Sequence, residues 1–454
     1  MTKIETDICV IGAGSGGLSV AAGAVQMGAR VVLVEAGEMG GDCLNTGCVP
    51  SKALLHAGKA GGGWAAAHVH VRETIAAIAP QDSVERFEGL GVHVLKGFAR
   101  FTSPREVEVG AARIMARRFV LATGSRPFVP GIPGLDALPY LTNETIFDLA
   151  QRPTHLVVLG GGPVGIEMAQ AHHRLGARVT VVEAGRALGR EDPEAAVLVL
   201  ETLRQKGIEI IEDAPVTAAG THAEGFALDT AKGEIVGSHL LVATGRAPSV
   251  DGMGLDTAGI ETTAQGIATD ARLRTTNRRV YAIGDVTGGP GFTHVAGYQA
   301  GVVVRSALFG LPARARTDHI PHAIYTTPEL AQVGLTEAEA RAAHGDALEV
   351  VRADLAGNDR AIATDQTAGF LKVMVVKGRP VGATLVGNDA GEQIAVWALA
   401  VSARLKMSAI AGTVLPYPTM AELSKRAAGA YFSPRLFDNL WVKRVVRTAQ
   451  RLLP

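Results

Sequence analysis

Cys43 and Cys48 stand close together in the stretch GGDCLNTGCVPSK, just before a helix that we expect to begin near Pro50. A zinc site would need more ligands, and the sequence offers neither another cysteine pair nor a spaced histidine pair. Cys48 precedes the expected helix, whose N-terminal dipole would stabilise a thiolate. The pair therefore favours a disulfide over a metal site. Cys9 falls in an apolar strand and is expected to pack in the core.

A second candidate for chemistry lies in the stretch LPYPTMAEL near the C-terminus. Pro416 and Pro418 favour an extended chain, and Thr419 with Glu422 has the spacing of a helix capping box. This pattern predicts the start of a helix. It does not explain Tyr417, which stays a candidate for the active site.

The elements that would position these residues begin with a strand, a turn and a helix. Ile8–Ile11 reads as a buried strand, an alanine-rich helix follows, and a second buried strand, Arg30–Val34, ends at Glu35. The turn between the first strand and the helix has the pattern Gly-x-Gly-x-x-Gly, at Gly12, Gly14 and Gly17. The three glycines permit a tight bend, close approach of a pyrophosphate and helix packing, and the acid can bind a ribose. This unit predicts a dinucleotide site.

The same pattern returns in the middle of the chain, so we expect two dinucleotides. The glycines of the second turn are Gly160, Gly162 and Gly165. Glu183 ends the following strand, and its carboxylate would repel the extra phosphate of NADPH, which favours NADH. Arg186 and Arg190 follow within a few residues and leave NADPH possible.

Composition limits the classes of partner. The 454 residues predict two to four domains, and 44 basic residues balance 44 acidic ones, so no excess of positive charge favours nucleic acid. Glu5 and Asp7 precede the first apolar run and glycines interrupt it, which argues against a membrane span or a signal peptide. We expect a cytoplasmic protein that acts on small molecules.

The motifs together resemble those of the class I pyridine nucleotide-disulfide oxidoreductases, which include dihydrolipoamide dehydrogenase, glutathione reductase and mercuric reductase. The resemblance rests on both glycine patterns, GGDCLNTGCVPSK, ATG at 122–124, ATGR at 243–246 and YAIGD at 281–285. It implies an α/β fold with two Rossmann-like domains and a C-terminal α+β dimerisation domain. The implied segments are 1–150 and 269–318 for the FAD domain, 151–268 for the nicotinamide domain and 319–454 for the interface domain.

The resemblance also implies roles for individual residues. FAD would occupy the first dinucleotide site and the nicotinamide cofactor the second. Asp285 would contact the ribityl chain, Gly97 would lie near the adenine, and Gly245 would belong to the nicotinamide side. Lys52 and Glu167 would form an ion pair beside the flavin ring.

For the cysteines, the resemblance implies a division of labour. Cys48 would be the thiol beside the flavin that forms the charge-transfer thiolate, and Cys43 the outer thiol that attacks the substrate. In a homodimer, the C-terminal motif would complete the active site of the partner subunit. Its usual histidine is replaced by Tyr417, although Glu422 is retained, so general-base activation of a dithiol should be weaker.

Three functions follow from these features. The first is reduction of a small disulfide or another thiol-reactive electrophile with NADH. The second is a metal-ion reductase of the mercuric type, the members closest in the C-terminal motif, although the chain ends RTAQRLLP without a cysteine pair. The third is a dihydrolipoamide dehydrogenase-like component of a larger complex. The final segment LFDNLWVKRVVRTAQRLLP is expected to form a helix that packs on the body with a solvated basic face.

Overall fold

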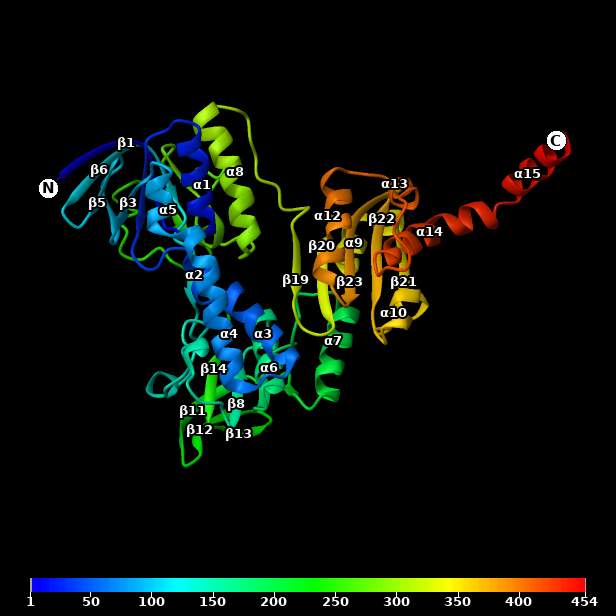
Figure 1. The fold of residues 1–454 in the computed structure, drawn as a ribbon, viewed down its shortest axis with the longest axis horizontal. Coiled ribbons are helices and arrows are strands. Elements are labelled where there is room, and N and C mark those ends of the chain that lie inside the picture. Colours follow the sequence, from blue (N-terminus) through cyan, green and yellow to red (C-terminus); the bar gives the residue numbers. More distant parts are fainter. Residues whose placement is uncertain (1, 454) are drawn as a thin grey trace. The chain divides into compact units, whose positions relative to one another are not determined.

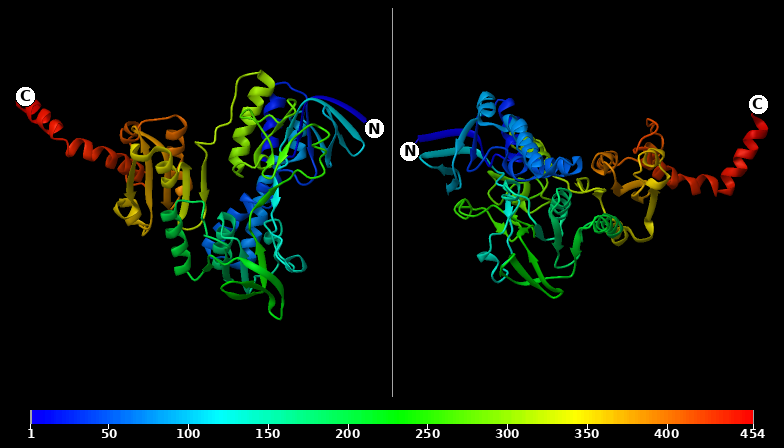
Figure 2. Two further views of the ribbon diagram at one scale, coloured as in Figure 1. Left: turned by 180° about the vertical axis from the view of Figure 1, so that it is seen from behind. Right: turned by 60° about the horizontal axis from the view of Figure 1, so that its bottom comes forward.

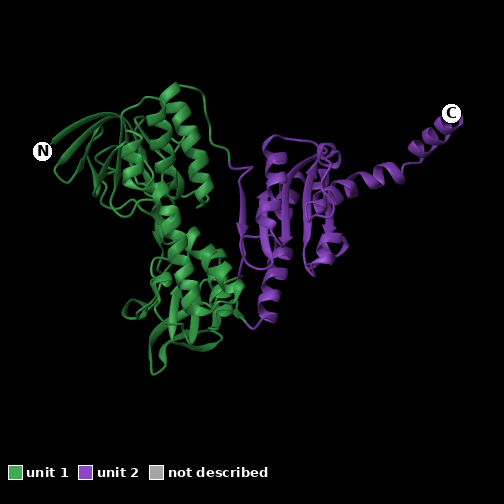
Figure 3. Cartoon of the chain, in the orientation of Figure 1, with its two compact units in different colours: residues 1–185, 208–316 green, residues 186–207, 317–454 purple. Residues whose placement is uncertain are grey.

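The computed structural model describes residues 2–453, which form two compact units (Figure 3). Unit 1 runs to Gly185 and resumes at Ile208–Arg316, and unit 2 comprises Arg186–Gly207 and the chain from Thr317 onward. Both units contain helices and strands, in agreement with the predicted α/β class (Figures 1 and 2).

The first dinucleotide unit is built on a seven-stranded sheet with the order β3-β2-β1-β6-β5-β4 and with β18 beside β6. Parallel pairing joins β1 to β2 and to β6, so that Ile11 lies between Val34 and Leu121. The predicted strand Ile8–Ile11 is the buried end of β1. The strands are β1 (Thr2–Ile11), β2 (Val31–Glu35), β3 (His93–Lys96), β4 (Ala99–Ser103), β5 (Glu106–Val109), β6 (Ala112–Leu121) and β18 (Val280–Ala282).

One face of this sheet is covered by α1 (Ser15–Gln26) and α8 (Thr293–Phe309), which lie against each other. Their small and β-branched residues bury Val10 and Leu33 of the sheet in one core cluster. The carboxyl ends of the parallel strands β1 and β2 therefore open toward the start of both helices. This places the glycine turn and the start of α8 at the same edge.

The second dinucleotide unit is a smaller sheet of the same kind, in which β10, β9, β8 and β14 are all parallel. Its strands are β8 (His155–Leu159), β9 (Arg178–Val182), β10 (Glu209–Ile211) and β14 (His239–Val242), and α6 (Pro163–Arg174) follows β8. An antiparallel sheet of β11 (Val216–His222), β12 (Gly225–Thr230) and β13 (Gly233–Gly237) completes this part. Both predicted strand-turn-helix units are therefore present.

The cysteines lie on two consecutive helices. Cys43 is in the middle of α2 (Gly41–Asn45), and Cys48 is the first residue of α3 (Cys48–Ala60). The helix thus begins two residues before the expected Pro50, because Gly47 is its N-cap. The glycine run after it ends the helix, since Gly61 adopts a left-handed φ of 79°, and α4 (Gly63–Ile78) packs back on α3.

Unit 2 has an antiparallel sheet in the order β19-β20-β23-β22-β21. Its strands are β19 (Pro321–Ile324), β20 (Glu329–Gly334), β21 (Leu348–Asp354), β22 (Phe370–Val376) and β23 (Arg379–Gly387). The helices are α7 (Pro193–Gln205), α9 (Glu337–His344), α10 (Asp359–Ala363), α11 (Ala390–Gln393), α12 (Ala395–Ser402), α13 (Met407–Ala411), α14 (Glu422–Phe437) and α15 (Leu440–Leu452). The core between sheet and helices centres on the fully buried Trp397, whose indole N–H donates to Ser424.

The division into two units does not resolve the four predicted segments, and their boundaries stay predictions. One helix of the predicted nicotinamide segment, α7, groups with the C-terminal unit. An ion cluster contributes to this grouping: Lys372, whose side chain is 6% exposed, contacts Asp192 at 2.8 Å, Glu337 at 3.0 Å and Glu194 at 3.3 Å. These contacts tie the start of α7 to β22 and α9.

Two expectations about the C-terminal segment are wrong. Thr419 does not cap a helix through its side chain, because its hydroxyl donates to the carbonyl of Pro416 and α14 begins only at Glu422. The last helix, α15, does not pack on the body, because none of its residues is buried. Within residues 2–453, no helix is long and apolar enough to cross a membrane.

The ion cluster generates a stability prediction. Lys372→Met leaves the buried Asp192 facing two further carboxylates without their shared cation, which should destabilise unit 2 by about 3 to 5 kcal/mol. Arg341→Met, which removes only an exposed ion pair with Glu337, should cost less than about 1 kcal/mol. Scanning calorimetry at one protein concentration compares the melting temperatures of the two variants. Equal melting temperatures would contradict the predicted contribution of the ion cluster to the stability of unit 2.

Candidate active site

The two glycine turns have the same geometry. Gly12 and Gly160 have φ values of 104° and 113°, and a Cβ at either would overlap the carbonyl oxygen of Ala122 or Ala243 on the neighbouring strand. A Cβ at the third glycine of each turn, Gly17 or Gly165, would overlap the carbonyl oxygen of the first. Only glycine fits at these four positions.

The middle glycines, Gly14 and Gly162, are different. No atom lies within 4 Å of where their Cβ would stand, so the backbone there faces open space at the start of α1 or α6. Helix N-termini present free N–H groups and positive potential to a phosphate. Each turn is therefore a cradle of the shape that a dinucleotide pyrophosphate needs.

The acids at the strand ends are held under the glycine turns by backbone N–H groups. Glu35 accepts from Ala13 at 2.5 Å and from Gly37 at 2.7 Å. In the second dinucleotide unit, Glu183 accepts from the N–H of Gly161 at 2.7 Å and from that of Gly185 at 2.9 Å. Each carboxylate oxygen retains lone-pair capacity, which suits ribose hydroxyl donors.

A pocket of about 830 Å³ in unit 1 joins the first glycine turn to the cysteines. Gly97, Gly245 and Asp285 line it, as do Lys52 and Glu167. One pocket thus contains residues from all the motifs of the first dinucleotide site. It also contains Gly245, which the resemblance assigned to the nicotinamide side. Pockets of this size are typical of cofactor sites.

The two sulfur atoms lie beside each other at the pocket wall, and the structure describes both as free thiols. The pKa of Cys48 is lowered to about 6, because Cys43 hydrogen-bonds to its sulfur and because Thr293 and the charge of Lys52 act in the same direction, against the effect of burial. The pKa of Cys43 is raised, because it takes part in the hydrogen bond to Cys48 and because it is partly buried. Cys48 is therefore the thiolate and Cys43 the thiol.

Lys52 and Glu167 form the ion pair that the resemblance implied, with 2.8 Å between Nζ and Oε2. Lys52 lies on the turn of α3 that follows Cys48, and Glu167 is buried on α6. The pair links the redox helix to the second glycine turn. The ammonium group of Lys52 is close enough to the Cys48 sulfur for its charge to lower the pKa of that thiol.

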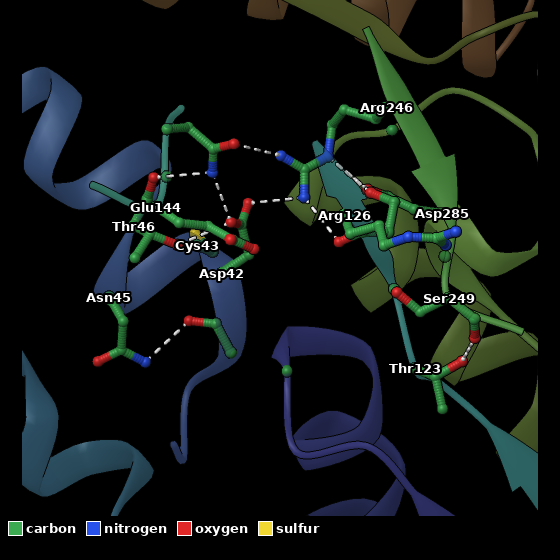
Figure 4. A pocket seen from close by; sticks show the side chains of 18 of the residues that line it. Asp42, Cys43, Asn45, Thr46, Thr123, Arg126, Glu144, Arg246, Ser249 and Asp285 are labelled. Atoms are coloured by element: carbon green, nitrogen blue, oxygen red, sulfur yellow. Dashed lines mark hydrogen bonds and ion pairs between the residues drawn. The ribbon is translucent and has the colours of Figure 1, made fainter. Parts of the chain in front are cut away.

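Arg246 forms a polar network that motif spacing did not predict (Figure 4). Its guanidinium lies 3.3 Å from the carboxylate of Asp42, and its Nε–H donates to the hydroxyl of Ser125 at 2.6 Å. Ser125 in turn donates to Asp285 at 2.6 Å. Asn143 donates to Asp42 at 2.9 Å, so the helix that holds Cys43 is tied to the opposite wall of the pocket.

Tyr417 and Glu422 lie in unit 2 and do not line this pocket. The Tyr417 side chain is 70% exposed, and its hydroxyl donates to Asp359 at 2.9 Å. The hydrogen bond to Asp359 raises the pKa of Tyr417. One buried carboxylate oxygen of Glu422 has no hydrogen-bond partner among residues 2–453, and Arg426 also binds Asp359, at 3.1 Å.

Three residues of the site were not predicted from the sequence. Asp42 precedes Cys43 in the quoted motif, and Arg246 ends the ATGR motif, so both could have been identified by position. The hydroxyl of Thr293 is 3.5 Å from the sulfur of Cys48, although Thr293, the first residue of α8, lies 245 residues later in the sequence. No local pattern marks it. No group of three His, Cys, Asp or Glu side chains within residues 2–453 is arranged to hold a metal ion.

Two family models match the chain. Residues 6–300 match the model described as pyridine nucleotide-disulphide oxidoreductase, and residues 320–428 match that of the dimerisation domain of the same family. The mercuric reductase of Streptomyces lividans is 36% identical, and the alignment covers 94% of this chain and 96% of the relative. The dihydrolipoyl dehydrogenase of Geobacillus stearothermophilus is 34% identical with the same coverage of both chains.

Solved structures show the same similarity. The Cu(II) complex of the HOCl-induced flavoprotein disulfide reductase RclA from Escherichia coli superposes with a TM-score of 0.88 and 28% identity. The match covers 94% of this chain and 99% of that one. The similarity therefore extends through both units.

The hydrogen bond between the cysteines generates a prediction on reactivity. In the reduced protein, iodoacetamide should alkylate Cys48 with a rate that follows thiolate formation near pH 6. Cys43→Ala removes the hydrogen bond and should move this pKa toward the ordinary thiol value of about 8.5. Cys43→Ser keeps a hydroxyl donor and should move it less. Mass spectrometry of the labelled peptides measures the rates, and identical profiles for the two variants would refute the hydrogen bond.

Proposed function

The chain belongs to the pyridine nucleotide-disulphide oxidoreductase family, and we propose that it uses NADH to reduce a small disulfide or another thiol-reactive acceptor through Cys43 and Cys48. The family match confirms the resemblance drawn from the motifs and the α/β fold class, and it identifies the protein as a flavoprotein disulfide oxidoreductase. The observation that supports the proposal most directly is the thiolate and thiol pair at the wall of the pocket.

The first glycine turn fits FAD. Gly12 and Gly17 hold the bend, Gly14 leaves room for the pyrophosphate, and Glu35 is placed to accept from the adenosine ribose. Asp285 lines the same pocket, where its carboxylate would accept from the hydroxyls of the ribityl chain. When bound, the flavin supplies a two-electron relay between the nicotinamide and the cysteine pair.

The second turn fits the nicotinamide cofactor. Glu183 is acceptor-only and already receives two backbone N–H groups, so it favours the free ribose hydroxyls of NADH over the phosphate of NADPH. Arg186 and Arg190 follow in sequence and are exposed, so use of NADPH is the alternative to be tested. Gly245, with no atom within 4 Å of its Cβ position, leaves space on this side of the pocket.

The cysteine pair performs the exchange with the acceptor. Cys43 and Cys48 share one proton, and in the minority form in which Cys48 holds it, the Cys43 thiolate attacks one sulfur atom of the substrate, breaks the substrate S–S bond and releases one thiolate. Cys48 next attacks Cys43 in this mixed disulfide, which releases the second thiolate and forms the Cys43–Cys48 disulfide. The first released thiolate takes the proton from Cys48 before Cys48 attacks, the second takes a proton from water, and the charge of Lys52 stabilises Cys48 whenever it is the thiolate.

The match to the dimerisation domain supports a homodimer, and we propose that Tyr417 enters the active site of the partner subunit. Its exposed phenol is available for such a contact, and its hydrogen bond to Asp359 keeps it protonated. A phenol in this state donates a proton but is a poor acceptor. Tyr417 therefore suits protonation of a leaving thiolate and not activation of a dithiol, which leaves Cys48 as the base for Cys43.

Reduction of a soft metal ion is the second candidate function. It is favoured by the mercuric reductases among the relatives and by the Cu(II) complex of the structural neighbour. Two adjacent sulfur ligands, one of them a thiolate, suit a soft ion. The similarity to dihydrolipoyl dehydrogenase keeps lipoamide as a third acceptor, which the protonated Tyr417 disfavours.

A panel of acceptors tests the proposed function. Oxidation of NADH and NADPH is followed with low-molecular-weight disulfides, lipoamide, Hg(II), Cu(II) and a quinone. Cys43→Ser should lower turnover of the thiol-reactive acceptor by at least about 1,000-fold and leave quinone reduction by the flavin unchanged. Disulfide turnover that survives this change would exclude the two-thiol mechanism. A higher kcat/KM with NADPH than with NADH would exclude the role given to Glu183.

Replacement of the tyrosine tests the assignment of the proton donor. Tyr417→His introduces a base that titrates near 6.5 and should raise lipoamide turnover by about 10-fold or more. Tyr417→Phe, which has neither donor nor base, should not raise it. If the wild-type enzyme already turns over lipoamide as fast as Tyr417→His, the argument from the phenol is wrong.

A further inference from the structure

The last helix of the chain, α15, has an unusual charge composition. It has no acidic residue, and it concentrates positive charge in a chain whose basic and acidic residues are equal in number, 44 of each. Its cations are Lys443, Arg444, Arg447 and Arg451. Because no carboxylate lies on the same helix, no pairs of opposite charge within it neutralise this face.

The cations are separated from the apolar residues around the helix axis. At 3.6 residues per turn, the four cations fall on one side together with Gln450. The opposite side is formed by Trp441, Val442, Val445, Val446, Ala449 and Leu452. Only Leu440, in the first turn, departs from this division. The helix therefore has one apolar face with an aromatic residue and one basic face.

Neither face is covered by the described chain. No residue of α15 is buried, and Trp441 is 70% and Leu452 79% exposed. The helix continues from α14 away from the sheet of unit 2 (Figures 1 and 2). The match to the dimerisation domain ends at residue 428, before α15 begins. The segment is thus outside the part of the chain that shares the family interface.

We propose that α15 lies in the surface of a membrane that contains anionic phospholipids. Its apolar face would enter the boundary between headgroups and acyl chains, and its basic face would meet the lipid phosphates. The side chain of Asn439 accepts from the N–H groups of Trp441 and Val442, which fixes the start of the helix. With 13 residues α15 spans about 20 Å, too short to cross the membrane but sufficient to lie along it.

Charge complementarity favours this partner over two others. Pairing of the apolar faces of two copies would cover those faces but would leave all eight cations, four from each helix, without a carboxylate partner on either helix. A nucleic acid would neutralise the cations but leave Trp441 and its apolar neighbours exposed. An anionic lipid surface accommodates both faces at once. This inference does not depend on the identity of the electron acceptor.

Sedimentation with vesicles tests the proposal on the FAD-containing, full-length protein. It should sediment with vesicles of phosphatidylcholine and phosphatidylglycerol, less with phosphatidylcholine alone, and less again at high salt. Ending the chain after Asn439 should abolish sedimentation and leave NADH oxidation with a quinone unchanged, because α15 has no buried residue. Failure of the full-length protein to bind the anionic vesicles at low salt would overturn the proposal.

Point variants distinguish the two faces. Arg444→Gln, Arg447→Gln and Arg451→Gln together should lower vesicle binding at least 10-fold, whereas the matched control Arg100→Gln, Arg117→Gln and Arg314→Gln should not. Trp441 emission should shift to shorter wavelength when vesicles are added, and Trp441→Phe should lose this shift. If Trp441→Ser with Val445→Ser instead converts a dimer to a monomer in light scattering without lipid, α15 covers the partner subunit and the lipid assignment is wrong.

Discussion

The coupling between the thiols of Cys43 and Cys48 is the interaction on which the chemistry of the site depends. It makes the two thiols unequal: Cys48 becomes a thiolate near neutral pH, and Cys43 retains its proton. The fold maintains this inequality by starting α3 at Cys48, by placing Lys52 one turn later, and by binding that lysine to the buried Glu167. A nucleophile and its base thus lie side by side without a histidine.

The same local solution appears twice in unit 1. In each dinucleotide unit, the first and third glycines bring strand and helix into contact, the middle glycine faces open space, and a strand-end acid is held by two backbone N–H groups. Two cofactors can then be bound by chemically equivalent cradles. The pocket that joins the first cradle to the cysteines is also lined by Lys52, Glu167 and Gly245.

Features determined by the backbone could be predicted from the sequence, and contacts between distant side chains could not. A positive φ and close contact with the backbone of the neighbouring strand both require glycine, so the positions of Gly12 and Gly160 in the sequence predicted the two turns. Lys52 and Glu167 were paired by resemblance alone, and the structure shows the contact. The hydrogen bond of Tyr417 to Asp359 depends on how α10 and the segment before α14 pack, which no local pattern encodes. The predicted cap at Thr419 failed for a similar reason, because a turn to Pro416 already uses its hydroxyl.

Anaerobic titration with NADH tests the central claim most directly, because it counts the electrons that the protein accepts. If Cys43 and Cys48 form the redox pair, the oxidised enzyme takes up one more pair of electrons than the flavin alone, and alkylation then labels both residues. Cys43→Ser should accept only the electrons of the flavin. A wild-type titration that ends when the flavin is reduced, with no newly labelled cysteine, would contradict the account.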